Sequence, residues 1–130
     1  MAQKIAKNDP AGSHALLAQL EIHRNSYDAA ERHLRDAVEL APYQVGRLID
    51  LAKFLATRGR TNESDAFFEK ASTVAPDSPH LLFERAATLI KTNRNPDEAR
   101  RLLHQYLKSP LTPKDPSRHE AEALLKKIGA

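Results

Sequence analysis

Histidine is the residue type in this sequence with the widest chemistry, because its imidazole can bind a metal ion or transfer a proton near neutral pH. No two of the six histidines have the i, i+4 spacing that places two ligands on one face of a helix, and His23 and His33 lie on either side of an expected turn. A site assembled across helices is possible but has no support in the spacing, so we expect no metal site and interpret these residues as surface histidines. They are His14, His23, His33, His80, His104 and His119.

The candidate nucleophiles and acids form no catalytic pattern. Ser13, Ser64, Ser72 and Ser109 lie outside any nucleophile elbow, and the carboxylates show neither the paired spacing of acid–base catalysis nor a metal-base motif. The absence of cysteine excludes thiol nucleophiles, disulfide scaffolds and cysteine-based zinc sites. The four glycines are too scattered for a phosphate-binding loop. We therefore predict that the protein is not an enzyme and uses no cofactor.

The length and composition fit a single domain. The chain has 130 residues, of which 41% are hydrophobic and 28% charged, and a formal net charge of +3. No apolar run approaches the ~18 residues that span a bilayer, so we expect no membrane span. Residues 1–10 lack the apolar core of a signal peptide. This favours a cytoplasmic location, unless the chain is a piece of a longer, exported protein.

Two kinds of turn residue recur along the chain with a period of 34 residues. One kind is proline, which cannot continue a helix. The other is asparagine or glycine, the types that best tolerate the left-handed conformation in which many helices end. The two kinds alternate every 17 residues, which predicts a repeating unit of helix, turn, helix and turn. The prolines are Pro42, Pro76 and Pro110, and the other series is Asn25, Gly59 and Asn93.

The segments between these turns have the apolar spacing of helices. Ala30, Leu34 and Ala37 follow the pattern of one helical face, and no stretch alternates with the period of a strand. The expected helices span 11–24, 27–41, 45–58, 61–75, 79–92, 96–108 and 115–128. The expected N-cap residues are Ser26, Asn95 and Asp115.

At the 34-residue period, small residues align with small ones and large with large. Ala18, Ala52 and Ala86 form one small series, and Ala37 with Ala71 forms another. The matching large residues are Leu48 with Leu82, Leu55 with Leu89, and Leu34 with Phe68. Together with the closing prolines, this pattern resembles the tetratricopeptide repeat (TPR) family. The resemblance implies an all-α, right-handed superhelical solenoid of antiparallel helix pairs, with about seven helices.

The resemblance covers most of the chain. It implies three TPR-like repeats, at 11–44, 45–78 and 79–112, and a capping helix within 113–130. Residues 1–10 are either a leader or the remnant of a preceding helix, which Pro10 would close.

The third repeat departs from the pattern. Ala99 and Leu103 fall one residue late, and Tyr106 sits near a small-residue position. We therefore expect one extra residue in the turn around Asn95, with altered packing beside it.

In the TPR family the first helices of successive repeats line a concave groove. Carried over to this chain, the resemblance implies a groove with an apolar floor flanked by charges, which suits the apolar anchors of a partner's helix or extended segment. This predicts a scaffold that binds a peptide or helix of a partner protein. The groove residues are Gln19, Ile22, His23, Ile49, Asp50, Lys53, Phe83, Glu84, Ala87, Ile90 and Lys91, with Ala15, Ala56 and Thr57 on the same faces. Alternatively, Ile22 and Ile90 pack against neighbouring helices.

Some members of the family grip an acidic C-terminus with a clamp of lysines, asparagines and an arginine. The corresponding positions here are Ala15, Gln19, Asp50, His80 and Glu84. Two of these are carboxylates, which would repel an acidic ligand, so we expect no such clamp.

Two other functions stay open. The open face of the first repeat, around Leu16, Leu20 and Leu34, could pair with a second copy or a neighbouring domain. Basic residues beside the turns could form a phosphate-binding edge; these are Arg24, Arg58, Arg60, Lys91 and Arg94. Cations are favoured at helix C-termini in any case, and few aromatic residues accompany them, so nucleic acid is the least favoured partner.

Overall fold

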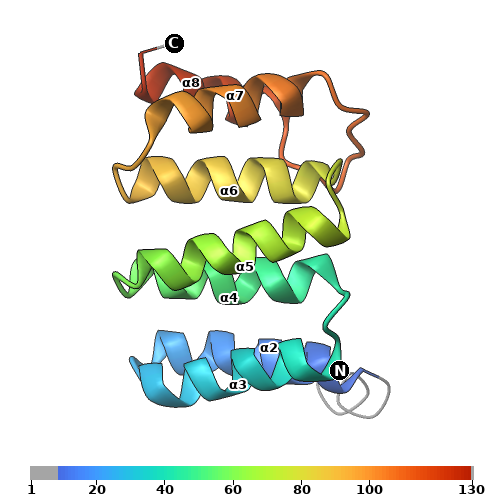
Figure 1. Cartoon of the computed structure of the whole chain (residues 1–130), viewed down its shortest axis with the longest axis vertical. Coiled ribbons are helices and arrows are strands. Elements are labelled where there is room, and N and C mark those ends of the chain that lie inside the picture. Colours follow the sequence, from blue (N-terminus) through green and yellow to red (C-terminus); the bar gives the residue numbers. More distant parts are fainter. Residues whose placement is uncertain (1–8, 130) are drawn as a thin grey trace. The chain divides into compact units, whose positions relative to one another are not determined.

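The structure is a computed structural model that describes residues 9–129, and the regular elements in this range are all helices. Each expected helix is present, and the all-α fold class is confirmed (Figure 1). The helices are α2 (Pro10–His23), α3 (Tyr27–Leu40), α4 (Val45–Thr57), α5 (Thr61–Val74), α6 (Pro79–Lys91), α7 (Pro96–Leu107) and α8 (Arg118–Lys127).

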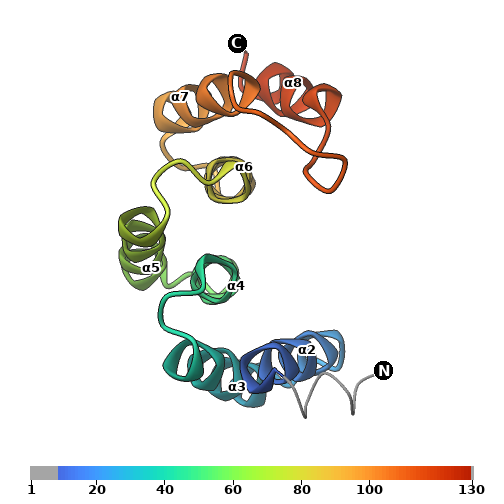
Figure 2. The same ribbon diagram turned by 90° about the vertical axis from the view of Figure 1, so that its right-hand side faces the viewer.

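The chain divides into two compact units, which are described separately. Unit 1 ends at Val74 and contains α2 to α5, and unit 2 begins at Ala75 and contains α6 to α8. In unit 1, α2 pairs with α3 and α4 with α5, and both helices of the first pair contact α4. In unit 2, α6 pairs with α7, and α8 contacts both (Figure 2). Each unit is thus built from the helix pairs of a helical-repeat fold.

The turns inside the pairs confirm the predicted left-handed residues. Asn25, Gly59 and Asn93 have φ angles of 60°, 80° and 54°. The third turn is one residue longer than the other two and contains a second left-handed residue, Asn95, with φ of 44°. The extra residue predicted for this turn is therefore present. The connecting segments are 24–26, 58–60 and 92–95.

Small residues at the repeating positions lie where helices meet. Ala18, Ala52 and Ala86 are each fully buried. Ser64 occupies the repeat position of Ala30 and is also buried, and its hydroxyl donates a 2.7 Å hydrogen bond to the carbonyl of Ala52. This bond joins α5 to α4 and satisfies a hydroxyl that burial would otherwise penalise.

The third helix pair departs from the others at Tyr106. This residue lies one position after the place where the 34-residue period of Ala37 and Ala71 would continue. Tyr106 is fully buried, and its ring centroid lies 5.2 Å from that of Phe83 on α6. Its core cluster includes Leu103 of α7 together with residues of α6 and α8. A large ring thus packs where the earlier pairs have alanine, in accord with the altered packing expected here.

The prediction that Asp115 begins the last helix is wrong, because α8 begins at Arg118. The Asp115 carboxylate instead accepts a 2.9 Å hydrogen bond from the Thr112 N–H in the preceding turn. Ser117 caps α8 in a reciprocal capping box with Glu120, in which each side chain accepts from the other's backbone N–H. The spacing of Ser117 and Glu120 is the sequence signature of a capping box, but Ser117 was not among the predicted caps.

The N-terminal boundary also differs from the expectation. Pro10 is the first residue of α2, a position that suits proline, whereas the expected helix began at residue 11. Asp9 caps this helix by accepting a 2.9 Å hydrogen bond from the Gly12 N–H. Ser26 and Asn95 occupy N-cap positions as predicted, but their side chains make no capping bond. Residues 1–8 of the predicted leader lie outside the described residues.

Candidate functional site

Unit 1 contains a pocket of about 180 Å³ between its first helices, which we call the unit 1 pocket. Four of the predicted groove residues line it together: Gln19 and Ile22 from α2, and Asp50 and Lys53 from α4. Thr57, which was expected on the same face of α4, also lines the pocket, and Tyr27 and Phe54 complete the lining. The pocket therefore combines apolar and aromatic surface with an amide, a carboxylate and an ammonium group.

Tyr27 was not among the predicted groove residues, because it comes from the first turn of α3 rather than from the first helix of a repeat. Its hydroxyl donates a 2.9 Å hydrogen bond to Asn25 Oδ1. The guanidinium of Arg58 lies 4.1 Å from the centre of its ring, within the range of a cation–π contact. These contacts hold the ring at the pocket wall. Tyr27 directly follows the Asn25–Ser26 turn. An aromatic residue at this predicted helix start was the feature of the sequence that could have indicated its place in the pocket.

The charged residues of the unit 1 pocket belong to a local network. Asp50 forms a 3.4 Å ion pair with Arg47, one turn earlier on α4. The Nε atom of Arg47 is buried without a hydrogen-bond partner among the described residues. The side chain of Thr57, at the end of α4, is held by a 2.8 Å hydrogen bond to the carbonyl of Phe54.

Two predicted groove residues of unit 1 do not line this pocket. Ile49 is completely buried, so its assignment as a ligand contact is wrong and it belongs to the core. Ala15 and Ala56, on the same predicted faces, are also buried. His23 is exposed at the end of α2, outside the pocket. The error at Ile49 arises because α4 contacts helices on several sides and buries more than one of its faces.

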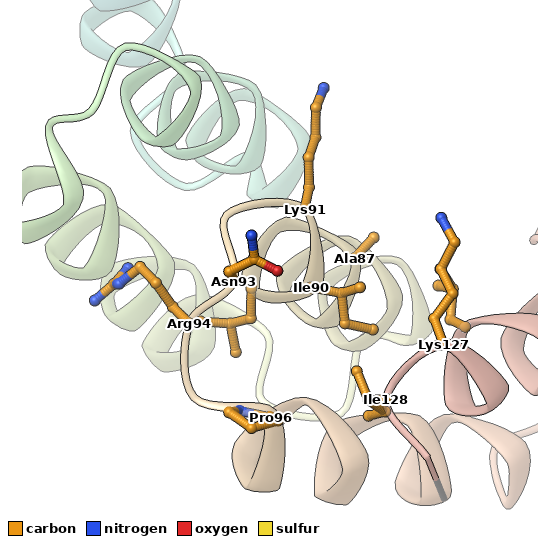
Figure 3. A pocket seen from close by; sticks show the side chains of 10 residues that line it. Ala87, Ile90, Lys91, Asn93, Arg94, Pro96, Lys127 and Ile128 are labelled. Carbon is orange, nitrogen blue, oxygen red and sulfur yellow. The ribbon is translucent and has the colours of Figure 1, made fainter.

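Unit 2 contains a larger pocket of about 750 Å³, which we call the unit 2 pocket. It lies where α6 ends, α7 begins and α8 ends (Figure 3). Three predicted groove residues line it: Ala87, Ile90 and Lys91. The other lining residues are Leu89, Asn93, Arg94, Pro96, Leu124, Lys127 and Ile128.

The unit 2 pocket has an apolar floor with cations around it. Ile90 and Ile128 point toward one another, while Lys91 and Lys127 extend in the same general direction on either side of Ala87 (Figure 3). The Arg94 side chain points away from these two lysines. The described residues that line the pocket include no carboxylate. This arrangement suits an anionic group that is attached to an apolar one.

Phe83 and Glu84, the other predicted groove residues of unit 2, line neither pocket. Phe83 is half-buried and packs against the ring of Tyr106. The Glu84 carbonyl accepts a 2.8 Å hydrogen bond from the hydroxyl of Thr88, one turn later on α6. The sequence placed both on the correct helix, but the large residue at Tyr106 draws Phe83 into the core cluster.

The prediction that the histidines are separate surface residues is wrong for one pair. His14 of α2 and His33 of α3 face each other, with 2.9 Å between their Nδ1 atoms. The Nε2 atom of His33 lies 3.5 Å from the carboxylate of Glu21. The pair is 19 residues apart in sequence and meets across two antiparallel helices, so a search for ligands on a single helix could not find it.

A four-residue ion-pair network joins α3 to the start of α5. Arg35 donates hydrogen bonds to Glu31 (2.9 Å) and Glu63 (2.8 Å), and Arg60 donates to the same two carboxylates at 2.5 Å and 3.0 Å. The hydrogen bond from Arg60 lowers the pKa of Glu31, and that from Arg35 lowers the pKa of Glu63. Arg60, predicted as part of a phosphate-binding edge, is therefore engaged within the protein.

The first helix exposes a group of leucines. Leu16, Leu17 and Leu20 of α2 are 40%, 42% and 46% exposed, and we call them the α2 leucine patch. Leu34, which the sequence analysis placed on the same open face, is buried in the core instead. Among the described residues, no helix has the length and apolar character needed to cross a membrane.

Neither a protein-family model nor a curated protein matches this sequence. Solved structures match the fold. PcrH from Pseudomonas aeruginosa has a TM-score of 0.75 at 14% identity, over 95% of this chain and 94% of PcrH. The Yersinia enterocolitica type III secretion translocator chaperone SycD, in an alternative dimer, has a TM-score of 0.71 at 18% identity, over 93% of this chain and 92% of SycD.

SycD has also been solved in complex with a peptide of the translocator YopD. That structure has a TM-score of 0.68 at 17% identity, over 93% of each chain. This chain thus shares the helical-repeat fold of PcrH and SycD.

Proposed function

We propose that this protein is a TPR-like module that binds a peptide segment of a partner protein and carries out no catalytic step. The observation that carries the proposal is the unit 1 pocket, in which four independently predicted groove residues, from two helices, line one hollow. The complex of SycD with a YopD peptide supports it, because the same fold there holds a peptide. The three repeats at 11–44, 45–78 and 79–112, with a cap after them, belong to this proposal.

The size of the unit 1 pocket suggests which part of the peptide it takes. At about 180 Å³ it is smaller than the ~300–1,000 Å³ that encloses a drug-sized ligand. A single apolar side chain of the peptide fits such a space, with Ile22 and Phe54 as its contacts. Lys53 and Gln19 then lie beside the peptide backbone and can bind its polar groups.

The unit 2 pocket extends the proposal to the charge of the peptide. Lys91 and Lys127 flank an apolar floor, so an acidic residue beside an apolar one matches this surface. Unit 1 would thus take an apolar anchor of the partner, and unit 2 an acidic residue beside an apolar one.

A displayed random-peptide library tests both pockets. Selection on the full chain should enrich peptides with aliphatic or aromatic anchors and acidic residues. Ile22→Glu should weaken the selected peptides at least about tenfold, whereas His23→Glu, on the same helix but outside the pocket, should leave their affinity unchanged. Equal losses in the two variants, both folded by circular dichroism, would contradict the assignment of the pocket.

A second variant tests the preference of the unit 2 pocket for acidic peptide residues. Lys91→Glu combined with Lys127→Glu should shift selection from acidic toward basic peptide residues. Retention of the acidic preference in this double variant would remove the role of the unit 2 pocket.

Self-association is a second candidate function, favoured by the α2 leucine patch. Three partly exposed leucines on one helix form an apolar surface that a second copy could cover. The structure of SycD as an alternative dimer shows association within this fold. Light scattering should detect a dimer that Leu16→Glu with Leu20→Glu dissociates, and a monomer at high protein concentration would exclude this function.

A further inference from the structure

We propose that His14, His33 and Asp36 form a binding site for a divalent transition-metal ion, with Zn²⁺ as the best-suited ion. One ligand atom from each of these three residues lies within 4.8 Å of the other two, in the part of the chain that the structure describes. His33 and Asp36 are separated by one turn on α3, and His14 approaches them from α2. The site uses none of the residues that line either pocket, so it is independent of the proposed peptide binding.

The distance between the two imidazoles is close to that in a metal site. Their Nδ1 atoms are 2.9 Å apart. Two nitrogens bound to a tetrahedral Zn²⁺ at 2.0–2.1 Å are about 3.3 Å apart. A separation of the rings by a few tenths of an ångström therefore makes room for the ion.

Glu21 supplies the outer support that metal-binding histidines usually have. Metal binding through Nδ1 requires each ring to carry its hydrogen on Nε2. In His33 that atom faces Oε2 of Glu21 at 3.5 Å, so the carboxylate is placed to accept the hydrogen and orient the ring. The other oxygen of this carboxylate, Oε1, is buried without a hydrogen-bond partner among the described residues.

The charge of the site favours a divalent cation. The two imidazoles are neutral, and the carboxylates of Asp36 and Glu21 carry one negative charge each. Zn²⁺ would neutralise these two charges. Nitrogen and carboxylate donors together suit Zn²⁺ better than Ca²⁺ or Mg²⁺, which prefer oxygen ligands. Three protein ligands leave one position of a tetrahedral ion for water or for a group from a partner. Bound there, the ion would join α2 to α3.

Titration of the untagged full chain with Zn²⁺ alone tests the proposal. Calorimetry should give one ion per chain, and Co²⁺ in its place should develop the visible absorption of a tetrahedral complex. His14→Ala and His33→Ala should each abolish binding. Glu21→Gln should weaken it about 10- to 100-fold at unchanged stoichiometry. His23→Ala and His104→Ala are matched controls, and both should bind as the wild type does.

Nuclear magnetic resonance of the wild-type chain decides the outcome even if a variant fails to fold. Zn²⁺ should shift the Nδ1 resonances of His14 and His33 and leave those of His80 and His119 in place. Asp36→Asn provides a milder variant, expected to lower the affinity while the two imidazoles still respond. The absence of a Zn²⁺-dependent change at His14 and His33, or an equal loss of binding in His23→Ala, would overturn the proposal.

Discussion

The hydroxyl of Tyr106 donates a 2.5 Å hydrogen bond to the main-chain carbonyl of Pro116, and so ties α7 to the segment that leads into α8. Tyr106 is fully buried, so bulk water does not offer its hydroxyl another hydrogen-bond acceptor. A buried donor with a single well-placed acceptor contributes to stability chiefly because leaving it unpaired is costly. The position of the segment before α8 therefore depends on the side chain that breaks the alanine pattern of the earlier helix pairs.

Substitution of Tyr106 by phenylalanine should remove this bond and keep the packing of the ring. The expected loss is about 0.5–1.5 kcal/mol of unfolding free energy, measured by urea titration. Tyr43→Phe is the control, because Tyr43 is 83% exposed and its substitution should change the stability little. Equal stabilities of the Tyr106→Phe variant and the wild type would mean that the hydrogen bond to Pro116 contributes nothing.

Acidification should destabilise the protein partly through the Glu31–Glu63 network. Both carboxyl groups have a lower pKa in the folded chain than in the unfolded chain, because Arg60 and Arg35 donate hydrogen bonds to them. The stability that they contribute is present above the usual glutamate pKa of about 4.3 and is lost as the pH falls through the lowered folded-state values.

A comparison of variants isolates this contribution. Glu31→Gln should be less stable than the wild type at pH 7, and the difference should shrink as the pH falls below about 4. Glu39→Gln, an exposed position on the same helix, should follow the wild-type profile. A pH-independent difference for Glu31→Gln would show that the substitution acts through packing rather than charge.

Gly59 should tolerate asparagine better than alanine. Its φ of 80° is left-handed, and the corresponding turn residues of the other two helix pairs are both asparagine. A β-carbon at Gly59 would meet no atom within 4 Å, so the backbone conformation alone sets the penalty. Gly59→Ala should cost about 1–2 kcal/mol by urea unfolding, and Gly59→Asn clearly less.

Gly46 provides the opposite control. It lies inside α4, where a β-carbon also meets no atom within 4 Å. Gly46 is the second residue of α4 and has a helical backbone, so Gly46→Ala should raise the stability by about 0.4–1 kcal/mol, because alanine restricts the unfolded chain. Equal effects of alanine at the two glycines would contradict the left-handed turn.

The N-cap serine of α8 should contribute more to the free energy of unfolding than the N-cap serine of α3. Ser117→Ala removes an acceptor for the Glu120 N–H and should cost about 1 kcal/mol. Ser26 occupies the N-cap of α3 without a side-chain capping bond, so Ser26→Ala should cost less. Chemical unfolding of the two variants side by side measures the difference, and a larger loss at Ser26 would refute it.

The repeat period, together with the apolar spacing of the helices, predicted the elements of this fold, because most helices lie between a proline and a left-handed turn. It also predicted the burial of Ala18, Ala52 and Ala86, since small residues at a fixed period mark helix contacts. The start of α8 was less predictable. Two candidate caps, Asp115 and Ser117, lie two residues apart there, and the glutamate that selects Ser117 went unnoticed.

The residues of the candidate sites were predictable only where their position on a single helix face determines their role. Gln19, Ile22, Asp50 and Lys53 were predicted because the resemblance to the TPR family assigns the groove to single faces of the first helices, and these four residues line one pocket. The facing of His14 and His33 depends on how two helices are aligned along each other, which no pattern within either helix reveals. The same holds for Lys127, which reaches the unit 2 pocket from α8.

Within each unit, the helices that contact each other are neighbours along the chain or are separated by one helix. The residues that meet in the folded state are therefore close together in sequence, and little chain entropy is lost before a contact can form. Helical proteins with such local contacts fold in microseconds to milliseconds, far faster than the ribosome adds a residue. Contacts between α2 and α3, including that of His14 with His33, can thus begin to form while the later helices are still being synthesised.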